Sequence, residues 1–337
     1  MAFASEQKRI GRDENTLERM LKVSPPESAI LLKRQLFFPN DTVENDDHIF
    51  WEPYDLAADN LGNLFVADRS DAIFKFSSEG IFLNKFGRTG QGPGDLSMPL
   101  GIRVLNDTIA VKESGNWRVQ RFDLSGRPLG STRVFKTYCS FDVDSQGRIF
   151  GVPLLFAATE HTPLVEVLTA EGQTERAFGR LLDFPHDYQQ LNMANLFLAG
   201  SKEVIVVFDY FPIIRRYTEA GELAAEYNMS SDLYDMKSRY NRNLYSKRPD
   251  ERVAYIQVVH GAAMSRGRLY LTDFVPPRLW IYEVDLYGKI INTYWAIVGD
   301  HYSPAAIVPH FDDNTVAFYI LTKTPEPRVE MFVPENR

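Results

Sequence analysis

Nine residues spread along the chain combine aromatic rings with a few charges, which is the mixture found in sites for small molecules and peptides. They are Trp51, Glu52, Arg69, Trp117, Tyr138, Tyr210, His260, Arg278 and Tyr302. The rings supply apolar contact, and the charged groups fix the polar atoms of a ligand. A fold that brings these residues to one surface would create a binding site there. The alternative is that the tyrosines line a packed channel.

Motifs of known catalytic chemistry are scarce in the sequence. The six histidines do not show the close spacing of metal ligands. No phosphate-binding loop, nucleophile elbow or cysteine-histidine pair stands out. Cys139 is the sole cysteine, so an intrachain disulfide is excluded, and its aromatic neighbours favour a buried thiol over a nucleophile.

Composition and charge narrow the class of protein. Hydrophobic residues make up 44% of the 337 residues, which is ample for a globular core. The net charge of -8 opposes nucleic-acid binding, which relies on lysine and arginine. No apolar run is long enough for a transmembrane segment. Residues 2–5 resemble the end of a cleaved signal, so we expect a periplasmic or extracellular protein if a leader preceded residue 1, and a cytoplasmic one otherwise.

A repeat of short strands and turns must position the nine residues. Equivalent strands end at glycines that follow one another at intervals of 46, 46, 49 and 67 residues, namely Gly80, Gly126, Gly172, Gly221 and Gly288. A period near 40 to 50 residues with about four strands is typical of a β-propeller. The glycines are expected at hairpin tips, where the backbone needs positive φ.

The ends of the chain predict how the propeller closes. A sixth repeat, residues 305–333, stops one strand short, whereas an unassigned strand, residues 30–38, precedes the first repeat. Pairing the two removes an exposed edge. We therefore predict an all-β, six-bladed propeller of four-stranded blades, closed by the N-terminal strand, over residues 28–337. Residues 1–27 are predicted to be a flexible leader, and residues 228–256 an insertion between blades 4 and 5 that forms either a mobile cap or a decorative loop.

The segment from Phe86 to Leu96, followed by Pro99, resembles the linker of NHL repeats, in which a Gly-rich turn and an acidic-hydrophobic pair lead to a proline. The chain is similar in this respect to bacterial six-bladed propellers with NHL repeats, many of unknown function. The resemblance implies that the nine residues lie on an upper face, around the central channel.

Residues 51–55 look similar to a stretch in gluconolactonase-like and regucalcin-like propellers. That resemblance implies that Glu52 could bind a divalent cation, with Asn195 as a second ligand, whereas the family's further Asn and Asp ligands have no match here. We expect no cofactor, although a divalent cation is an alternative.

The sequence thus predicts a non-catalytic propeller that binds a small molecule, peptide or protein on its upper face, with nucleic acid disfavoured as a partner. The alternative function is a metal-dependent hydrolase or lyase of the gluconolactonase type, with its site in the central channel.

Overall fold

A computed structural model of the chain describes residues 14–39, 50–154, 158–185, 187–200, 203–247, 254–312 and 315–335. The chain divides into two compact units. The first unit comprises Met1–Leu31, Leu154–Leu164 and Phe178–Tyr302, and the second unit comprises Leu32–Pro153, Val165–Ala177 and Ser303–Arg337.

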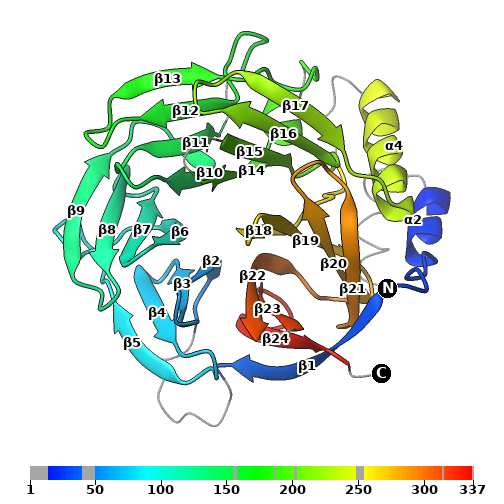
Figure 1. Cartoon of the computed structure of the whole chain (residues 1–337), viewed down its shortest axis with the longest axis horizontal. Helices are drawn as coiled ribbons and strands as arrows, with labels where there is room; N and C mark the ends of the chain where they lie inside the picture. Colours follow the sequence, from blue (N-terminus) through cyan, green and yellow to red (C-terminus); the bar gives the residue numbers. More distant parts are fainter. Residues whose placement is uncertain are drawn as a thin grey trace. The chain divides into compact units, whose positions relative to one another are not determined.

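Antiparallel strands that follow one another in sequence make up nearly all of the structure (Figure 1). Four separate sheets contain four strands each. Their strands are β2 to β5 (Pro53–Ala58, Leu64–Asp68, Ala72–Phe76, Phe82–Phe86), β6 to β9 (Pro99–Leu105, Thr108–Glu113, Arg118–Asp123, Pro128–Arg133), β10 to β13 (Tyr138–Val143, Ile149–Pro153, Val165–Leu168, Thr174–Phe178) and β14 to β17 (Ala194–Ala199, Glu203–Phe208, Ile213–Thr218, Leu223–Asn228).

The remaining strands form one eight-stranded sheet in the order β18-β19-β20-β21-β1-β24-β23-β22. Its strands are β18 (Gly261–Ser265), β19 (Arg268–Val275), β20 (Arg278–Asp285), β21 (Ile290–Ile297), β1 (Ile30–Phe38), β24 (Arg328–Pro334), β23 (Thr315–Thr322) and β22 (Pro304–Asp312).

The prediction of six separate four-stranded blades closed by the N-terminal strand is therefore wrong. Strand β1 does pair with β24, in antiparallel register from Leu32 to Phe38. However, its first two residues, Ile30 and Leu31, pair in parallel with Tyr294 and Trp295 of β21. A strand offers hydrogen-bonding groups along both edges, so β1 joins two sets of strands instead of completing one separate blade.

The prediction for the repeated glycines is confirmed. All five occupy hairpin tips with φ between +78° and +91°. At Gly126, with φ +90°, an added Cβ would lie 2.4 Å from Cγ of Phe86 on the outermost strand of the preceding sheet. The glycine thus serves both the turn and the close approach of a neighbouring aromatic ring.

Replacing Gly126 with alanine should lower the free energy of unfolding by at least about 2 kcal/mol, because strain at positive φ adds to overpacking against Phe86. Urea unfolding would measure the loss. Gly94→Ala is the matched control, since Gly94 has φ +85° but its nearest neighbour, Cγ of Pro128, is 3.4 Å from the added Cβ. Equal losses in the two variants would show that the contact with Phe86 contributes nothing.

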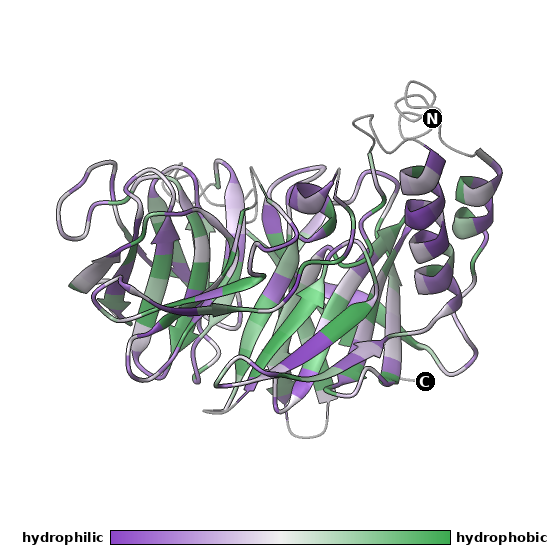
Figure 2. Ribbon diagram, turned by 90° about the horizontal axis from the view of Figure 1, so that it is seen from above, coloured by the Kyte–Doolittle hydropathy of each residue, from purple (hydrophilic) through white to green (hydrophobic). Residues whose placement is uncertain are grey.

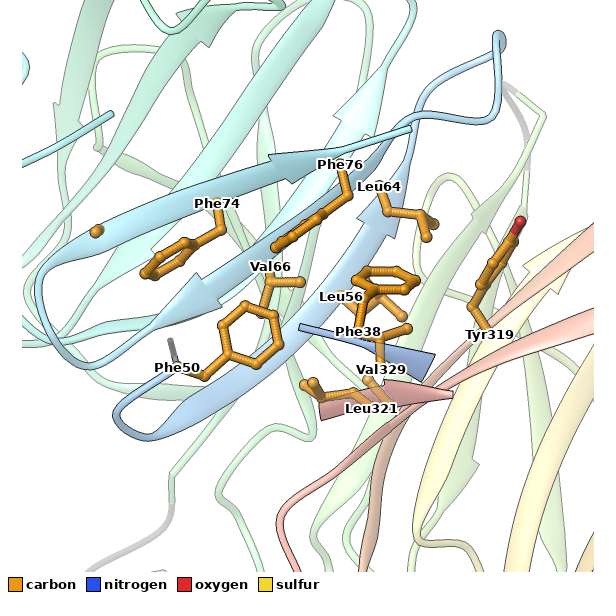
Figure 3. Packing of buried hydrophobic residues seen from close by; sticks show 12 residues of the cluster. Phe38, Phe50, Leu56, Leu64, Val66, Phe74, Phe76, Tyr319, Leu321 and Val329 are labelled. Carbon is orange, nitrogen blue, oxygen red and sulfur yellow. The ribbon is translucent and has the colours of Figure 1, made fainter. Parts of the chain in front are cut away.

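Hydrophobic side chains from seven strands meet in one core cluster of the second unit, with Ala306 of β22 among them. Figure 3 shows rings and aliphatic groups of β1, β2, β3, β4, β23 and β24 packed together. Phe38 of β1 lies with its ring centroid 4.8 Å from that of Phe76, and both side chains are buried. Burial of a phenylalanine side chain contributes about 2 to 3 kcal/mol, so Phe38 anchors β1.

Among the described residues of the first unit, three helices accompany the strands: α2 (Glu14–Leu21), α3 (Tyr188–Leu191) and α4 (Asp232–Lys247). Figures 1 and 2 show α2 and α4 side by side, and Figure 2 shows that both are rich in hydrophilic residues. Met20 of α2 is buried, and the Arg278 guanidinium donates to the carbonyls of Leu21 and Val23, at 3.4 and 3.5 Å. The predicted flexibility of residues 1–13 lies outside the described residues.

Helix α4 occupies most of the predicted insertion and is firmly anchored. The buried amide of Asn241 donates to the carbonyls of Tyr210 and Ile256, at 2.9 and 2.8 Å, and accepts from the Ile256 N–H. These bonds fix α4 to the segment that leads into β18. The expectation of a mobile cap stays a prediction; residues 248–253 lie outside the described residues.

Candidate functional site

One backbone hydrogen bond recurs where the second strand of a sheet ends. The residue that follows this second strand donates its N–H to a backbone carbonyl. The carbonyl belongs to a residue just before the first strand of the same set, which is the innermost strand of a propeller blade. The bonds are Arg69 to Glu52 (3.1 Å), Ser114 to Met98 (3.0 Å), Asp209 to Met193 (2.9 Å) and Lys323 to Ser303 (3.1 Å). These four positions are therefore equivalent. The second unit places the cations Arg69 and Lys323 there, whereas the first unit places the carboxyl group of Asp209.

The innermost strands of the second unit also share an irregularity in their pairing. The pairing register shifts at their second residue in β2, β6, β10 and β22. A β-bulge leaves one residue unpaired and redirects its side chain, and such bulges often lie beside functional sites. The residues in this position are Tyr54, Leu100, Cys139 and Ala305. Tyr54 and Cys139 thus present their polar groups from equivalent places.

Opposite charges surround the ring of Tyr54, which is 38% exposed. Nζ of Lys323 lies 4.5 Å from the ring centroid, a cation–π distance. The Arg69 guanidinium donates to the Glu52 carboxylate at 2.6 Å, and both charges act on the Tyr54 hydroxyl. Burial raises the pKa of Tyr54, with Asp55 adding to the effect, and burial lowers the pKa of Lys323.

A second group of charges continues from Asp55. Its carboxylate accepts from the Arg103 guanidinium at 2.9 Å and from the Ile102 N–H at 3.0 Å. Lys112 is buried and donates to the carbonyl of Tyr138. Burial lowers the pKa of Lys112 to about 8, while Cys139 and Asp55 act in the opposite direction. Cys139 also acts on Tyr54, so the two groups are continuous.

We call this set of side chains the Tyr54 site: Glu52, Tyr54, Asp55, Arg69, Arg103, Lys112, Cys139 and Lys323. It contains four cations and two carboxylates, and the adjacent buried carboxyl group of Asp68, which accepts from the Glu52 N–H at 3.0 Å, reduces the formal positive excess to one in a chain with a net charge of -8. Partial burial strengthens the field of these charges relative to bulk water. The arrangement can therefore hold an anion.

The structure brings some of the predicted second-unit residues to this site. Glu52 and Arg69 belong to it, and the backbone of Tyr138 accepts from Lys112. The Tyr138 side chain is buried and hydrogen-bonded to Glu166 at 3.3 Å. Trp51 and Trp117 are 79% and 49% exposed, in the segments beside β2 and β8.

The predicted first-unit residues have separate surroundings. The Tyr210 hydroxyl accepts from the Gln190 amide at 3.2 Å. Arg278 contacts the end of α2, as described above. Tyr302 is buried with its ring centroid 6.0 Å from that of Phe274. The Asn195 amide donates to Asp209 at 2.8 Å.

His260 lies beside a buried ion pair between Lys237 of α4 and Asp273 of β19, whose side chains are 1% and 0% exposed. Lys237 also donates to the carbonyl of Gln257 at 3.0 Å. Nδ1 of His260 is 3.5 Å from the Asp273 carboxylate. Burial, with help from the Lys237 charge, lowers the pKa of His260 to about 3, so this imidazole is neutral at pH 7. Burial raises the pKa of Asp273, and Lys237 opposes that change.

The two residues named as metal ligands both have protein partners, since Glu52 pairs with Arg69 and Asn195 pairs with Asp209. Among the described residues, no three His, Cys, Asp or Glu side chains gather in a group that could hold a metal ion. The cofactor expectation is therefore still a prediction.

Sequence reasoning missed most of the Tyr54 site. The residues not identified as site residues were Tyr54, Asp55, Arg103, Lys112, Cys139 and Lys323. A usable signal was present for Lys112, since it interrupts the hydrophobic run of β7. A charge in a strand that is otherwise buried needs a partner, and that requirement marks it for attention.

Comparison with solved structures identifies the fold. The chain is similar to a Bacteroides fragilis protein that is predicted to be exported, with a TM-score of 0.62, 13% identity, and coverage of 94% of this chain and 98% of that one. A Bacteroides vulgatus member of the DUF4221 family gives 0.58 at 10% identity, with 93% and 100% covered. The WD40 β-propeller domain of Doa1 gives 0.50 at 8% identity, with 84% and 79% covered.

These likenesses show an all-β propeller fold and, at such low identities, nothing more. No protein-family model matches the sequence, and no curated protein does. The resemblance to NHL repeats stays a prediction. In the described part of the chain, no helix has the length and apolar character required to cross a bilayer.

Proposed function

We propose that the chain is a binding propeller whose second unit takes an anionic ligand at the Tyr54 site. The observation that carries the proposal is the cluster of four cations around two carboxylates in an otherwise acidic protein. Arg69 and Lys323 are the cations nearest the exposed Tyr54 ring, so they would contact the ligand first.

The roles of the cations differ. Arg103 and Lys112 are committed to Asp55 and to the Tyr138 carbonyl, so they mainly raise the local potential. Arg69 carries an exposed guanidinium, with 36% of its side chain accessible, and a guanidinium can bind a carboxylate through two parallel hydrogen bonds. Glu52 holds it in place until a ligand anion takes over that role.

Isothermal titration calorimetry with citrate tests the proposal, with triethyl citrate as the uncharged counterpart. We expect citrate to bind and triethyl citrate not to bind. The double variant Arg69→Gln and Lys323→Gln should weaken citrate binding at least tenfold, about 1.4 kcal/mol. Added salt should weaken binding to the native protein as well.

Arg127→Gln is the matched control, because Arg127 is an exposed arginine paired with Asp123 in the turn between β8 and β9. It should leave citrate affinity within twofold of the native value. No citrate binding, or equal binding by the double variant, would overturn the proposed function.

A further inference from the structure

Four large hydrophobic side chains lie exposed at the end of the sheets where β2, β6 and β10 begin, which is also the end that carries Tyr54 and Cys139. We call them the aromatic rim: Trp51, Met98, Trp117 and Phe135, which are 79%, 39%, 49% and 73% exposed. Two backbone hydrogen bonds link the segments that carry Met98, Trp117 and Phe135. Ser114, three residues before Trp117, donates to Met98 at 3.0 Å, and Val134, next to Phe135, donates to Trp117 at 2.8 Å. Exposed apolar residues gathered in this way mark interaction surfaces.

The backbone at two rim positions is strained. Met98 and Trp117 have φ of +50° and +53°, in the left-handed region that favours glycine and asparagine. This conformation is unfavourable for a residue that carries a Cβ atom. Asn116 holds the turn in place by donating to the carbonyl of Gly90 and to Glu113, at 2.8 and 2.7 Å. The chain thus retains strain to present large side chains that its own fold only partly buries, as functional surfaces do.

Two residues of the rim lie close in sequence to residues of the Tyr54 site. Trp51 directly precedes Glu52, whose carboxylate pairs with Arg69, and Phe135 lies four residues before Cys139. Tryptophan, phenylalanine, methionine and arginine are the residue types enriched where proteins bind one another. A small anion would need the cations alone and would leave the rim unused.

We infer that the ligand class is an acidic polypeptide segment, whose apolar side chains pack on the aromatic rim while a carboxylate binds Arg69 and Lys323. This inference rests on the proposed function and adds the apolar half of the ligand. The positive excess at the Tyr54 site supplies the charge complementarity.

Fluorescence polarisation with three labelled, amidated heptapeptides tests it. One peptide alternates leucine with glutamate, one alternates serine with glutamate, and one alternates leucine with lysine. We expect the leucine-glutamate peptide to bind at least tenfold more tightly than either of the others. The double variant Trp51→Ala and Trp117→Ala should weaken its binding at least tenfold while citrate affinity stays within twofold.

Leu61→Ala is the matched control, since Leu61 is 83% exposed in the turn between β2 and β3, at the opposite end of that sheet. It should leave peptide affinity unchanged. Equal binding of the three peptides, with citrate still bound, would overturn this inference and spare the proposed function. Tryptophan-dependent binding of maltooligosaccharides or anionic vesicles without peptide binding would overturn it too. Failure of citrate to bind would overturn the proposed function itself.

Discussion

Replacing Lys237 with methionine should lower the free energy of unfolding by roughly 3 to 5 kcal/mol, which is the usual loss when one partner of a buried ion pair is removed. The Asp273 carboxyl group would stay buried, with its side chain 0% exposed and no cation beside it. Burial is the larger of the two causes that lower the pKa of His260, and it persists in the variant, so it disfavours a charged imidazole as a replacement for the lysine. Methionine nearly preserves the volume of lysine, so the charge is the main quantity removed.

The double variant Lys237→Met and Asp273→Asn should recover most of that loss. Asparagine keeps an acceptor for the Phe274 N–H, which donates to Asp273 at 2.7 Å, and it carries no charge to compensate. Urea unfolding of the two single variants and the double variant gives the coupling energy of the pair. Lys247→Met, at the exposed end of α4, is the control and should change stability by less than about 0.5 kcal/mol. Equal losses at positions 237 and 247 would contradict the structural role of the pair.

The sequence predicted those features of the fold that depend on local pattern. Glycines at a regular interval mark hairpin tips because only a residue without Cβ accepts both positive φ and a close aromatic neighbour, and Gly126 shows both. The same pattern indicated that residues 30–38 form a strand. It could not show that this strand hydrogen-bonds along both edges, because the pairing with β21 involves only Ile30 and Leu31.

The candidate site was only partly predictable, for a different reason. Glu52 and Arg69 stood out as charges among aromatic residues. Lys112 of β7 and Lys323, the residue after β23, lie far apart in sequence. The bulges that redirect Tyr54 and Cys139 depend on the pairing register, which the side-chain pattern does not encode. Lys237 was missed because a charged residue on an amphipathic helix normally faces solvent, whereas this one faces a buried carboxyl group.

Replacing Asp209 with asparagine should remove a pH dependence from the stability of the protein. Burial raises the pKa of Asp209 to about 7, from an ordinary value of 3.8, and the Asn195 hydrogen bond opposes that shift. The folded state therefore keeps the proton to higher pH than the unfolded state does. The stability that the protonated Asp209 carboxyl group contributes is fully present below pH 3.8 and is lost as pH rises through about 7. The rise in pKa from 3.8 to about 7 corresponds to roughly 4 kcal/mol of unfolding free energy.

The difference in unfolding free energy between Asp209→Asn and the native protein should thus move in favour of the variant by up to about 4 kcal/mol between pH 4 and pH 8. Asparagine can still accept from the Asn195 amide, so the local hydrogen bond survives the change. Urea unfolding at four or five pH values measures the difference.

Asp68→Asn is the control. Both oxygens of this buried carboxyl group accept backbone N–H groups, from Glu52 at 3.0 Å and from Ser70 at 2.8 Å. An asparagine side chain has only one oxygen that can accept, so one of these bonds is lost. That variant should lose stability at pH 8, where Asp209→Asn gains it. A difference for Asp209→Asn that stays constant from pH 4 to pH 8 would mean that the carboxyl group is already ionised in the folded protein, and that burial there is weaker than the structure indicates.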